Sequence, residues 1–446
     1  MRDQEPAKAS DFFRAKRKFF SAQSLTTLLL AATGQARAQA LDRYFPANVP
    51  AYQDWIAAAN PVHEDGAAEP QGVRLGNIIL HPEVTERLSY DSSPFLGEPQ
   101  GGSAVVNSTA AVSADSDWSR NSLDARLSVD DFRYVALPHR SFTNWTAAIG
   151  GGLDYADNHI GFGYAHLNTV TLPTSVASFA VKTAIMEQVD DLRLNDTIGT
   201  GRLQLVPQIV GQAYRFGAAP GSSGRASGGT ASGGTFDHDA ATASLTASYA
   251  FAGGHNLLAI FSDSLVQYGG GMHAQRPANY DDASVLLGLE YRQSAIFAYR
   301  VVAGYEDRTA TGRGTLHGAI TSPAAELDLI YRPTVLTTLT LKVARSLQNE
   351  PTELAQGLAE TAVTLSVDHA YSRRVMLHLS AEYIRADFPS NGLSQSSTAA
   401  SVSASWRLGR DVTLSAEYAL VQTSGAGPGF SGFTRQQAML GIRFER

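Results

Sequence analysis

The chain of 446 residues has no cysteine, 40 glycines and only 17% charged residues, whereas a soluble globular domain usually carries about 25% charged residues. Its net charge of −7 and pI near 5.9 argue against a nucleic-acid partner, because surfaces that bind nucleic acid are basic. No apolar run reaches the roughly 18 residues that a membrane-spanning helix needs, which excludes helical spans. Low charge, many small residues and short alternating segments favour a β-barrel with lipid outside and water inside.

The N-terminus has the pattern of a secretory signal peptide. A basic region at Arg14–Lys18 precedes an apolar run at Ser24–Thr33, and Ala36–Ala40 (ARAQA) has the alternating small residues of a cleavage site. We therefore expect residues 1–40 to be removed before Leu41. The competing interpretation is an amphipathic surface helix, since the apolar run is too short to span a bilayer.

Residues 41–71 show no sustained hydrophobic period and contain four prolines. Proline lacks a backbone donor and is disfavoured inside sheets. We expect this stretch to be a periplasmic lead-in that either stays outside the barrel or folds into its lumen as a plug.

The segment RQQAMLGIRFER at the end of the chain sets the pattern for most of what precedes it. In it, Leu440, Ile442 and Phe444 alternate with polar or small residues, and a period of two predicts a strand with one apolar face. Similar strands are expected near 73–90, 103–114, 118–133, 143–155, 158–170, 202–217, 238–252, 255–269, 282–292, 295–307, 316–331, 335–348, 359–371, 374–388, 398–408, 411–423 and 435–445.

The stretch 175–199 is ambiguous. Short and long connections alternate along the chain, as periplasmic turns and extracellular loops do in barrels. Without a strand in 175–199, the Gly/Ser-rich loop 218–237 would fall on the side of the short turns. A weak strand at Phe179–Ile185 restores the alternation. Counting it predicts eighteen strands, with sixteen as the alternative.

These patterns predict an all-β protein, a transmembrane antiparallel up-and-down β-barrel over residues 72–446. The first and last strands should pair, because an open edge in lipid leaves backbone groups unsatisfied at several kcal/mol each. Leu80 and Leu440, or neighbours one or two positions away, should then come within bridging distance.

Strand parity also predicts which side chains line the lumen. The expected set contains both signs of charge, so it indicates neither a strong anion filter nor a strong cation filter. It can form a polar conduit, or a wall of mutually paired charges that fills a non-conducting lumen. Aromatic residues that could stack on sugar rings are few in this set. The expected lumen-lining residues are Asp124, Arg126, Asp130, Glu290, Arg292, Arg300, Glu326, Asp328, Lys342, His378, Glu382, Arg407, Glu417 and Arg443.

Two passages resemble the putative β-barrel porin 2 family. Gly72–Phe95 has a glycine-led apolar run, a proline and a Tyr-Asp tip, and Glu326–Glu353 has a strand, an Arg-Pro-Thr turn and a Thr-rich strand. The family usually has Tyr-Asp-Asp-Asn where this chain has Tyr90–Ser93. The resemblance implies a bacterial outer-membrane barrel of a kind often associated with exopolysaccharide production and secretion. It supplies no catalytic residues.

The sequence offers no motif for catalysis, a metal or a cofactor. It lacks a Walker loop, HExxH, GxSxG and a Cys/His cluster. His159, His166, Ser262 and Asn168 are present, but nothing in the sequence joins them into a hydrolytic site. We therefore expect an outer-membrane conduit rather than an enzyme, in contact with lipid and serving a secreted polysaccharide or its periplasmic export machinery. The alternative is a non-conducting structural or assembly barrel.

Overall fold

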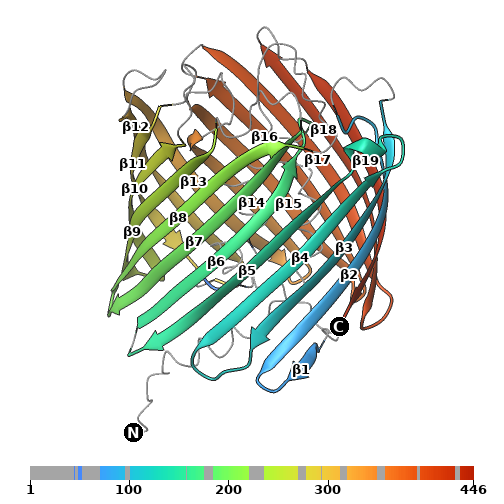
Figure 1. Ribbon diagram of the computed structural model, residues 1–446. Helices are drawn as coiled ribbons and strands as arrows, with labels where there is room; N and C mark the ends of the chain where they lie inside the picture. Colours follow the sequence, from blue (N-terminus) through green and yellow to red (C-terminus); the bar gives the residue numbers. More distant parts are fainter. Residues whose placement is uncertain are drawn as a thin grey trace.

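The computed structural model describes residues 45, 49–52, 71–95, 101–156, 158–174, 184–219, 236–269, 278–292, 294–311, 319–348, 357–388, 392–426 and 432–446. Tilted antiparallel strands follow one another around a closed barrel (Figure 1). Among the described residues, no helix is long and apolar enough to cross a membrane. The elements are β1 (Val73–Leu75), β2 (Ile78–Asp91), β3 (Ser103–Ser116), β4 (Ser122–Tyr134), the 3₁₀ turn η3 (Pro138–Arg140), β5 (Phe142–Tyr155), β6 (Asn158–Thr171), β7 (Ile185–Thr200), β8 (Leu203–Ala218), β9 (His238–Ala252), β10 (His255–Tyr268), β11 (Tyr280–Tyr291), β12 (Phe297–Ala310), β13 (Ala319–Thr334), β14 (Thr337–Gln348), β15 (Leu358–Ser372), β16 (Val375–Phe388), β17 (Leu393–Arg407), β18 (Val412–Ala426) and β19 (Phe433–Glu445).

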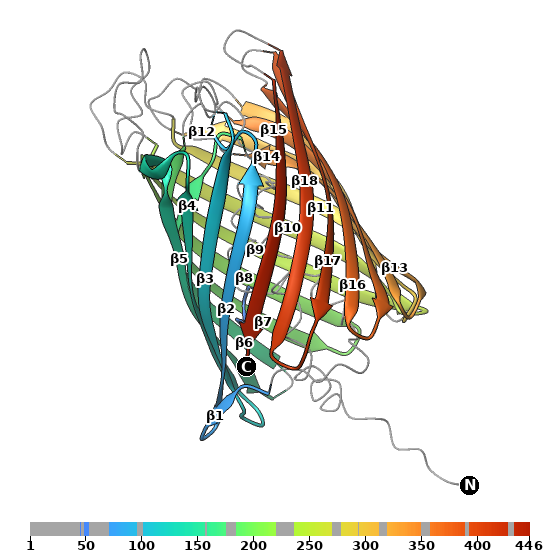
Figure 2. The same ribbon diagram turned by 90° about the vertical axis from the view of Figure 1, so that its right-hand side faces the viewer.

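The barrel has eighteen strands, β2 to β19, as the alternation of the sequence predicts. Each strand pairs with the next one in the chain, and β19 pairs with β2 to close the ring. Figure 2 shows β1 and the C-terminus at the same end of the barrel. The shortest connections, such as 201–202 and 253–254, lie at this end, which is the periplasmic end of an outer-membrane barrel.

The register of the closure differs from the expected one. Leu440 lies opposite Leu88, whereas Leu80 lies opposite Val73 of β1. The expected strand 73–90 is in fact two strands, because the chain reverses after β1 at Gly76, whose φ of 63° suits glycine. The first residues of β2 therefore pair with β1 instead of β19, and a proximity of Leu80 to Leu440 is wrong.

The strand expected in the ambiguous stretch exists but lies further along the chain. β7 begins at Ile185, whereas the weak strand was placed at residues 179–185, most of which lie outside the described residues. Asp190 and Asp196 share the outer face of β7 with Leu192, which is 59% exposed. These carboxylates interrupt the apolar alternation from which the sequence prediction was made.

The outer wall is apolar and carries aromatic rings near the periplasmic end. In β10 to β13 these rings form a continuous series that we call the outer ladder: His255, Tyr291, Tyr299, Phe297 and Tyr331. His255 stacks on Tyr291 at 4.6 Å between ring centroids and lies 3.0 Å from the Tyr299 hydroxyl. Amphipathic rings at this height form the interfacial girdle of a membrane barrel.

Candidate functional site on the inner wall

The side chains opposite the apolar outer face line the inside of the barrel. The structure places every expected lumen residue on this inner face or, for Arg292, directly after a strand. Their role in permeation stays a prediction. They lie on β4 (Asp124, Arg126, Asp130), on and after β11 (Glu290, Arg292), on β12 (Arg300), β13 (Glu326, Asp328), β14 (Lys342), β16 (His378, Glu382), β17 (Arg407), β18 (Glu417) and β19 (Arg443).

The inner faces of β19, β2, β3 and β4 form one densely polar region, which we call the charged sector. Arg87 donates to Asn107 Oδ1 at 2.9 Å and to Thr109 Oγ1 at 3.1 Å. Thr109 in turn donates to Asp130 at 2.6 Å, and Arg126 lies 3.9 Å from Glu83. Arg87 and Glu83 were missing from the expected set, although Arg87 alternates with the exposed Leu88.

Charges elsewhere on the inner wall also have partners of opposite sign. Glu290 pairs with Arg292 at 2.6 Å, and Arg300 lies 3.7 Å from Glu326. Such pairs neutralise one another locally.

A buried ion pair closes the extracellular end of the seam between β2 and β19. Arg435 Nη2 lies 2.6 Å from Asp91 Oδ2, and the two side chains are 3% and 1% exposed. Gln437 also donates to Asp91, at 2.9 Å. Arg435 further contacts the carbonyl of Thr174, whose hydroxyl donates to the carbonyl of Pro94. The seam pair thus anchors chain segments that follow β2 and β6.

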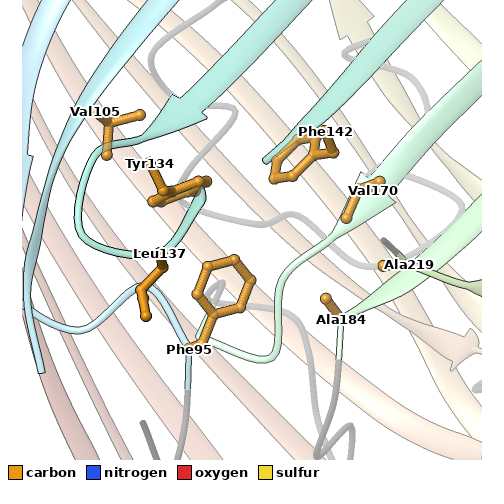
Figure 3. Packing of buried hydrophobic residues seen from close by; sticks show 8 residues of the cluster. All are labelled: Phe95, Val105, Tyr134, Leu137, Phe142, Val170, Ala184 and Ala219. Atoms are coloured by element: carbon orange, nitrogen blue, oxygen red, sulfur yellow. The ribbon is translucent and has the colours of Figure 1, made fainter. Parts of the chain in front are cut away.

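An apolar cluster covers the neighbouring part of the extracellular rim (Figure 3). Phe95, from the connection after β2, packs against Tyr134 at 5.1 Å between ring centroids. Leu137 and Phe142 join the same cluster, and Leu137 is fully buried. Phe95 therefore holds the described start of the first extracellular connection against the barrel in this sector.

Part of the lead-in segment lies against the inner wall of β5 to β8. Phe45, Val49 and Tyr52 form a buried cluster with wall residues of β5, β6 and β7. The Tyr52 hydroxyl donates to the Asp191 carbonyl at 3.0 Å, and burial raises the pKa of Tyr52. The Arg193 guanidinium lies 4.6 Å from the ring centroids of both Phe45 and Tyr52.

Gly163 on β6 leaves space on the inner wall for this contact. A Cβ there would lie 2.5 Å from Cε2 of Tyr52 and 3.0 Å from the Pro50 carbonyl oxygen. Glycine is therefore required for the segment to approach the wall this closely. Which part of the wall receives the segment could not be predicted, because the contact joins residues far apart in the chain.

The residues considered for a hydrolytic site do not come together. His166 faces outward on β6, stacked on Trp145 at 4.7 Å and 2.8 Å from Asp190. Ser262 faces inward on β10 and pairs with Ser284 at 2.7 Å. Within the described ranges, no group of three or more His, Asp or Glu side chains is arranged to hold a metal ion.

An apolar outer wall with interfacial rings, a polar inner wall and a closed ring of antiparallel strands define a porin-like β-barrel of the outer-membrane type. The family model described as "Putative beta-barrel porin 2" matches residues 66–446, and the chain belongs to that family. No curated protein sequence matches the chain.

Solved structures resemble the barrel at low identity. OccAB3 of Acinetobacter baumannii aligns with a TM-score of 0.44 and 10% identity over 82% of this chain and 99% of that one. OccK2 (OpdF) of Pseudomonas aeruginosa gives 0.45 and 12% over 82% and 98%. The FrpB iron transporter of Neisseria meningitidis gives 0.46 and 7% over 84% and 82%. Similarity at this level does not identify a cargo.

Proposed function

We propose that the protein is a passive outer-membrane conduit for polar solutes, with a secreted exopolysaccharide as its cargo. The observation that carries this proposal is the inner wall, where charges of both signs occur in pairs among hydroxyl and amide side chains. Barrels of sixteen to eighteen strands generally enclose an aqueous channel. Outer-membrane lipid surrounds the barrel, and the periplasmic machinery that delivers the polysaccharide is a second expected partner.

The lead-in segment narrows this conduit on one side. Its described residues, 45 and 49–52, lie on the inner faces of β5 to β8 and not outside the barrel. The contact with Arg193 and the Asp191 carbonyl fixes the segment by polar as well as apolar interactions. The conduit is thus bounded by the charged sector on one side and by the chain's own N-terminal part on another.

A second function is favoured by the same segment. A lumen that holds part of the chain, with wall charges that neutralise one another, also fits a structural barrel that conducts nothing. The two functions differ in one measurable property, the ion current through a single barrel.

Single-channel conductance in a planar bilayer tests the proposal, with Gly163→Val as the informative variant. The added side chain pushes Tyr52 away from the wall. The wild-type protein should show stable conductance steps, and the variant should show larger or noisier ones. Gly211→Val on β8 is the control, because nothing lies within 4 Å of a Cβ at Gly211. Insulating wild-type protein and insulating Gly163→Val together would establish the structural barrel instead.

A further inference from the structure

The inner faces of β8, β9 and β10 form a region without charged side chains, which we call the neutral sector. Across residues 204–216, 238–252 and 256–268, all of them described, no Asp, Glu, Lys or Arg points inward. The charged residues of these strands, Arg215, Asp239 and Asp263, lie on the outer face, which they share with exposed side chains such as Ile209 and Phe261. Within the described ranges, three adjacent strands therefore present no charged side chain to the lumen.

The middle of the neutral sector presents hydroxyl and amide groups. Thr242 on β9 lies opposite Ser264 on β10, with 2.9 Å between their hydroxyl oxygens. Ser262 pairs in the same way with Ser284 on β11, at 2.7 Å. Hydroxyls both donate and accept hydrogen bonds, so these pairs can also bond a polyhydroxylated ligand.

Above these hydroxyls, at the extracellular end, the inner wall carries a series of rings that we call the inner ladder. It consists of Tyr214 and Phe216 on β8, His238 on β9, Tyr268 on β10 and Tyr280 on β11. His238 stacks on Tyr214 at 4.5 Å between centroids and contacts Tyr268 at 5.0 Å. Tyr268 lies 6.5 Å from Tyr280. The ladder therefore crosses four strands.

The inner ladder contacts the lead-in segment at one end and an ion pair of the inner wall at the other. At one end, Tyr214 packs against the cluster formed by Phe45 and Tyr52 of the lead-in segment. At the other end, the Arg308 guanidinium lies 4.3 Å from the Tyr280 centroid and pairs with Asp282. Tyr214, Phe216 and Tyr268 are partly rather than fully buried in this arrangement.

The inner ladder adds aromatic residues that the expected lumen set, chosen by strand parity, does not contain. The rings lie at the ends of β8 to β11 next to long connections, where the sequence alternation is least regular.

We propose that the neutral sector and the inner ladder bind an uncharged saccharide chain. Sugar rings present apolar C–H faces, which stack on the electron-rich faces of aromatic rings, and a rim of hydroxyls, which pair with Ser, Thr and Gln side chains. The wall of β8 to β10 discriminates against anionic chains, because it offers no cation to replace their lost hydration. The Arg308 guanidinium beside Tyr280 is already paired with Asp282. The inference rests on the proposed conduit and adds the class of its cargo and the residues that hold it.

Two measurements with maltohexaose test this inference. Calorimetric titration in detergent micelles measures binding without requiring conduction, and block of single-channel current measures the same binding during permeation. We expect wild-type protein to bind maltohexaose. Phe216→Ala and Tyr268→Ala should each weaken binding by about tenfold, which corresponds to about 1.4 kcal/mol, because each variant removes one aromatic face.

Matched controls distinguish loss of saccharide binding from loss of folding, and specific binding from simple exclusion by size. Tyr249→Leu changes a ring on the outer face of β9 and should bind as the wild type does. Polyethylene glycol of the same hydrodynamic size and hexagalacturonate should bind less tightly than maltohexaose. Gel mobility of unheated samples shows whether each variant is folded.

The outcomes for the two proposals are distinct. Conduction without maltohexaose binding, or equal binding by wild type and both ring variants, would overturn the saccharide site and leave the conduit intact. Binding that depends on Tyr268 in a barrel that passes no current would overturn the conduit and keep the site. Tighter binding of hexagalacturonate would show that the cargo is anionic, against the inference.

Discussion

The charged sector and the neutral sector lie in the same barrel behind the same kind of outer wall, yet their interiors share almost nothing. In the charged sector, Arg87 and Asp130 are joined through Thr109 into a network of ions and hydrogen bonds. In the neutral sector, paired hydroxyls such as Thr242 and Ser264 lie below a series of rings. The outward positions must satisfy lipid and are similar throughout, whereas the inward positions are free to differ. The proposed function therefore depends on every second residue of a strand.

The outer and inner ladders show that tyrosine has a different role on each face of the barrel wall. In the outer ladder, Tyr291 and Tyr299 face lipid near the periplasmic end, where they hold the barrel at the membrane surface. In the inner ladder, Tyr268 faces the lumen at the other end. A shift of one position in the strand would exchange these roles.

The largest effect is expected at the seam of the charged sector. Asp91→Ala leaves the Arg435 guanidinium buried without its carboxylate, and removing one partner of a buried pair costs roughly 3–5 kcal/mol. The midpoint of urea unfolding in lipid vesicles should fall accordingly. Asp131→Ala is the control. It breaks an exposed pair with Arg133 on the outer face, worth about 0–1 kcal/mol. Equal losses of stability in the two variants would show that the buried pair of Asp91 and Arg435 contributes no more than the exposed pair.

The next largest effect tests the outer wall that both sectors share. Leu287→Arg places a charge on a lipid-facing side chain that is 61% exposed, at a cost of roughly 2–4 kcal/mol near the bilayer midplane. Folding yield in vesicles should drop. The same change at Ser403, which lies between His378 and Glu417 on the inner face, should be mild. A comparable drop at Ser403 would mean that the assignment of faces is wrong.

Cysteines at Leu88 and Leu440 test the closure that places the charged sector next to the end of the chain. The two residues are directly opposed in β2 and β19, and the chain has no cysteine of its own. Mild oxidation should cross-link them, with a shift in gel mobility and a stabilisation of at most about 2–4 kcal/mol. The pair Leu80 and Leu440 should stay uncross-linked, because Leu80 pairs with β1. A cross-link at Leu80 alone would restore the register expected from the sequence.

The smallest effect sharpens the electrostatic contrast. Thr246→Asp adds a carboxylate to the neutral sector, where no inward charge of β8 to β10 offsets it. The reversal potential across a salt gradient should shift toward cation preference. Ser128→Asp adds the same charge to the charged sector, between Arg126 and Asp130 on the inner face of β4, and should shift the potential less because Arg126 screens it. A larger shift at Ser128 would contradict the division into sectors.

Much of the barrel could be predicted from sequence because a single rule, alternation, generates it. That rule gives the strand count, the closure of the last strand on the first and the inward charges such as Glu290 and Arg300. The rule fails where charged residues occupy the outer face of a strand, as Asp190 and Asp196 do on β7.

The features that define the candidate site were harder to predict because they are long-range or lie at strand ends. Asp91 and Arg435 are separated by 344 residues, and nothing local in either segment points to the other. Tyr52 docks on a wall selected by the absence of a side chain at Gly163. The rings of the inner ladder come together only when four strand ends are set side by side.

The pairing of β2 with β19 also has a consequence for how the chain reaches its native state. Closing the ring brings together segments from opposite ends of the barrel sequence, and contacts of such separation make folding slow. Until they form, both edge strands expose unpaired backbone groups, which lipid does not tolerate. Insertion and closure should therefore occur as one concerted event, and intermediates with half a barrel in the bilayer should not accumulate.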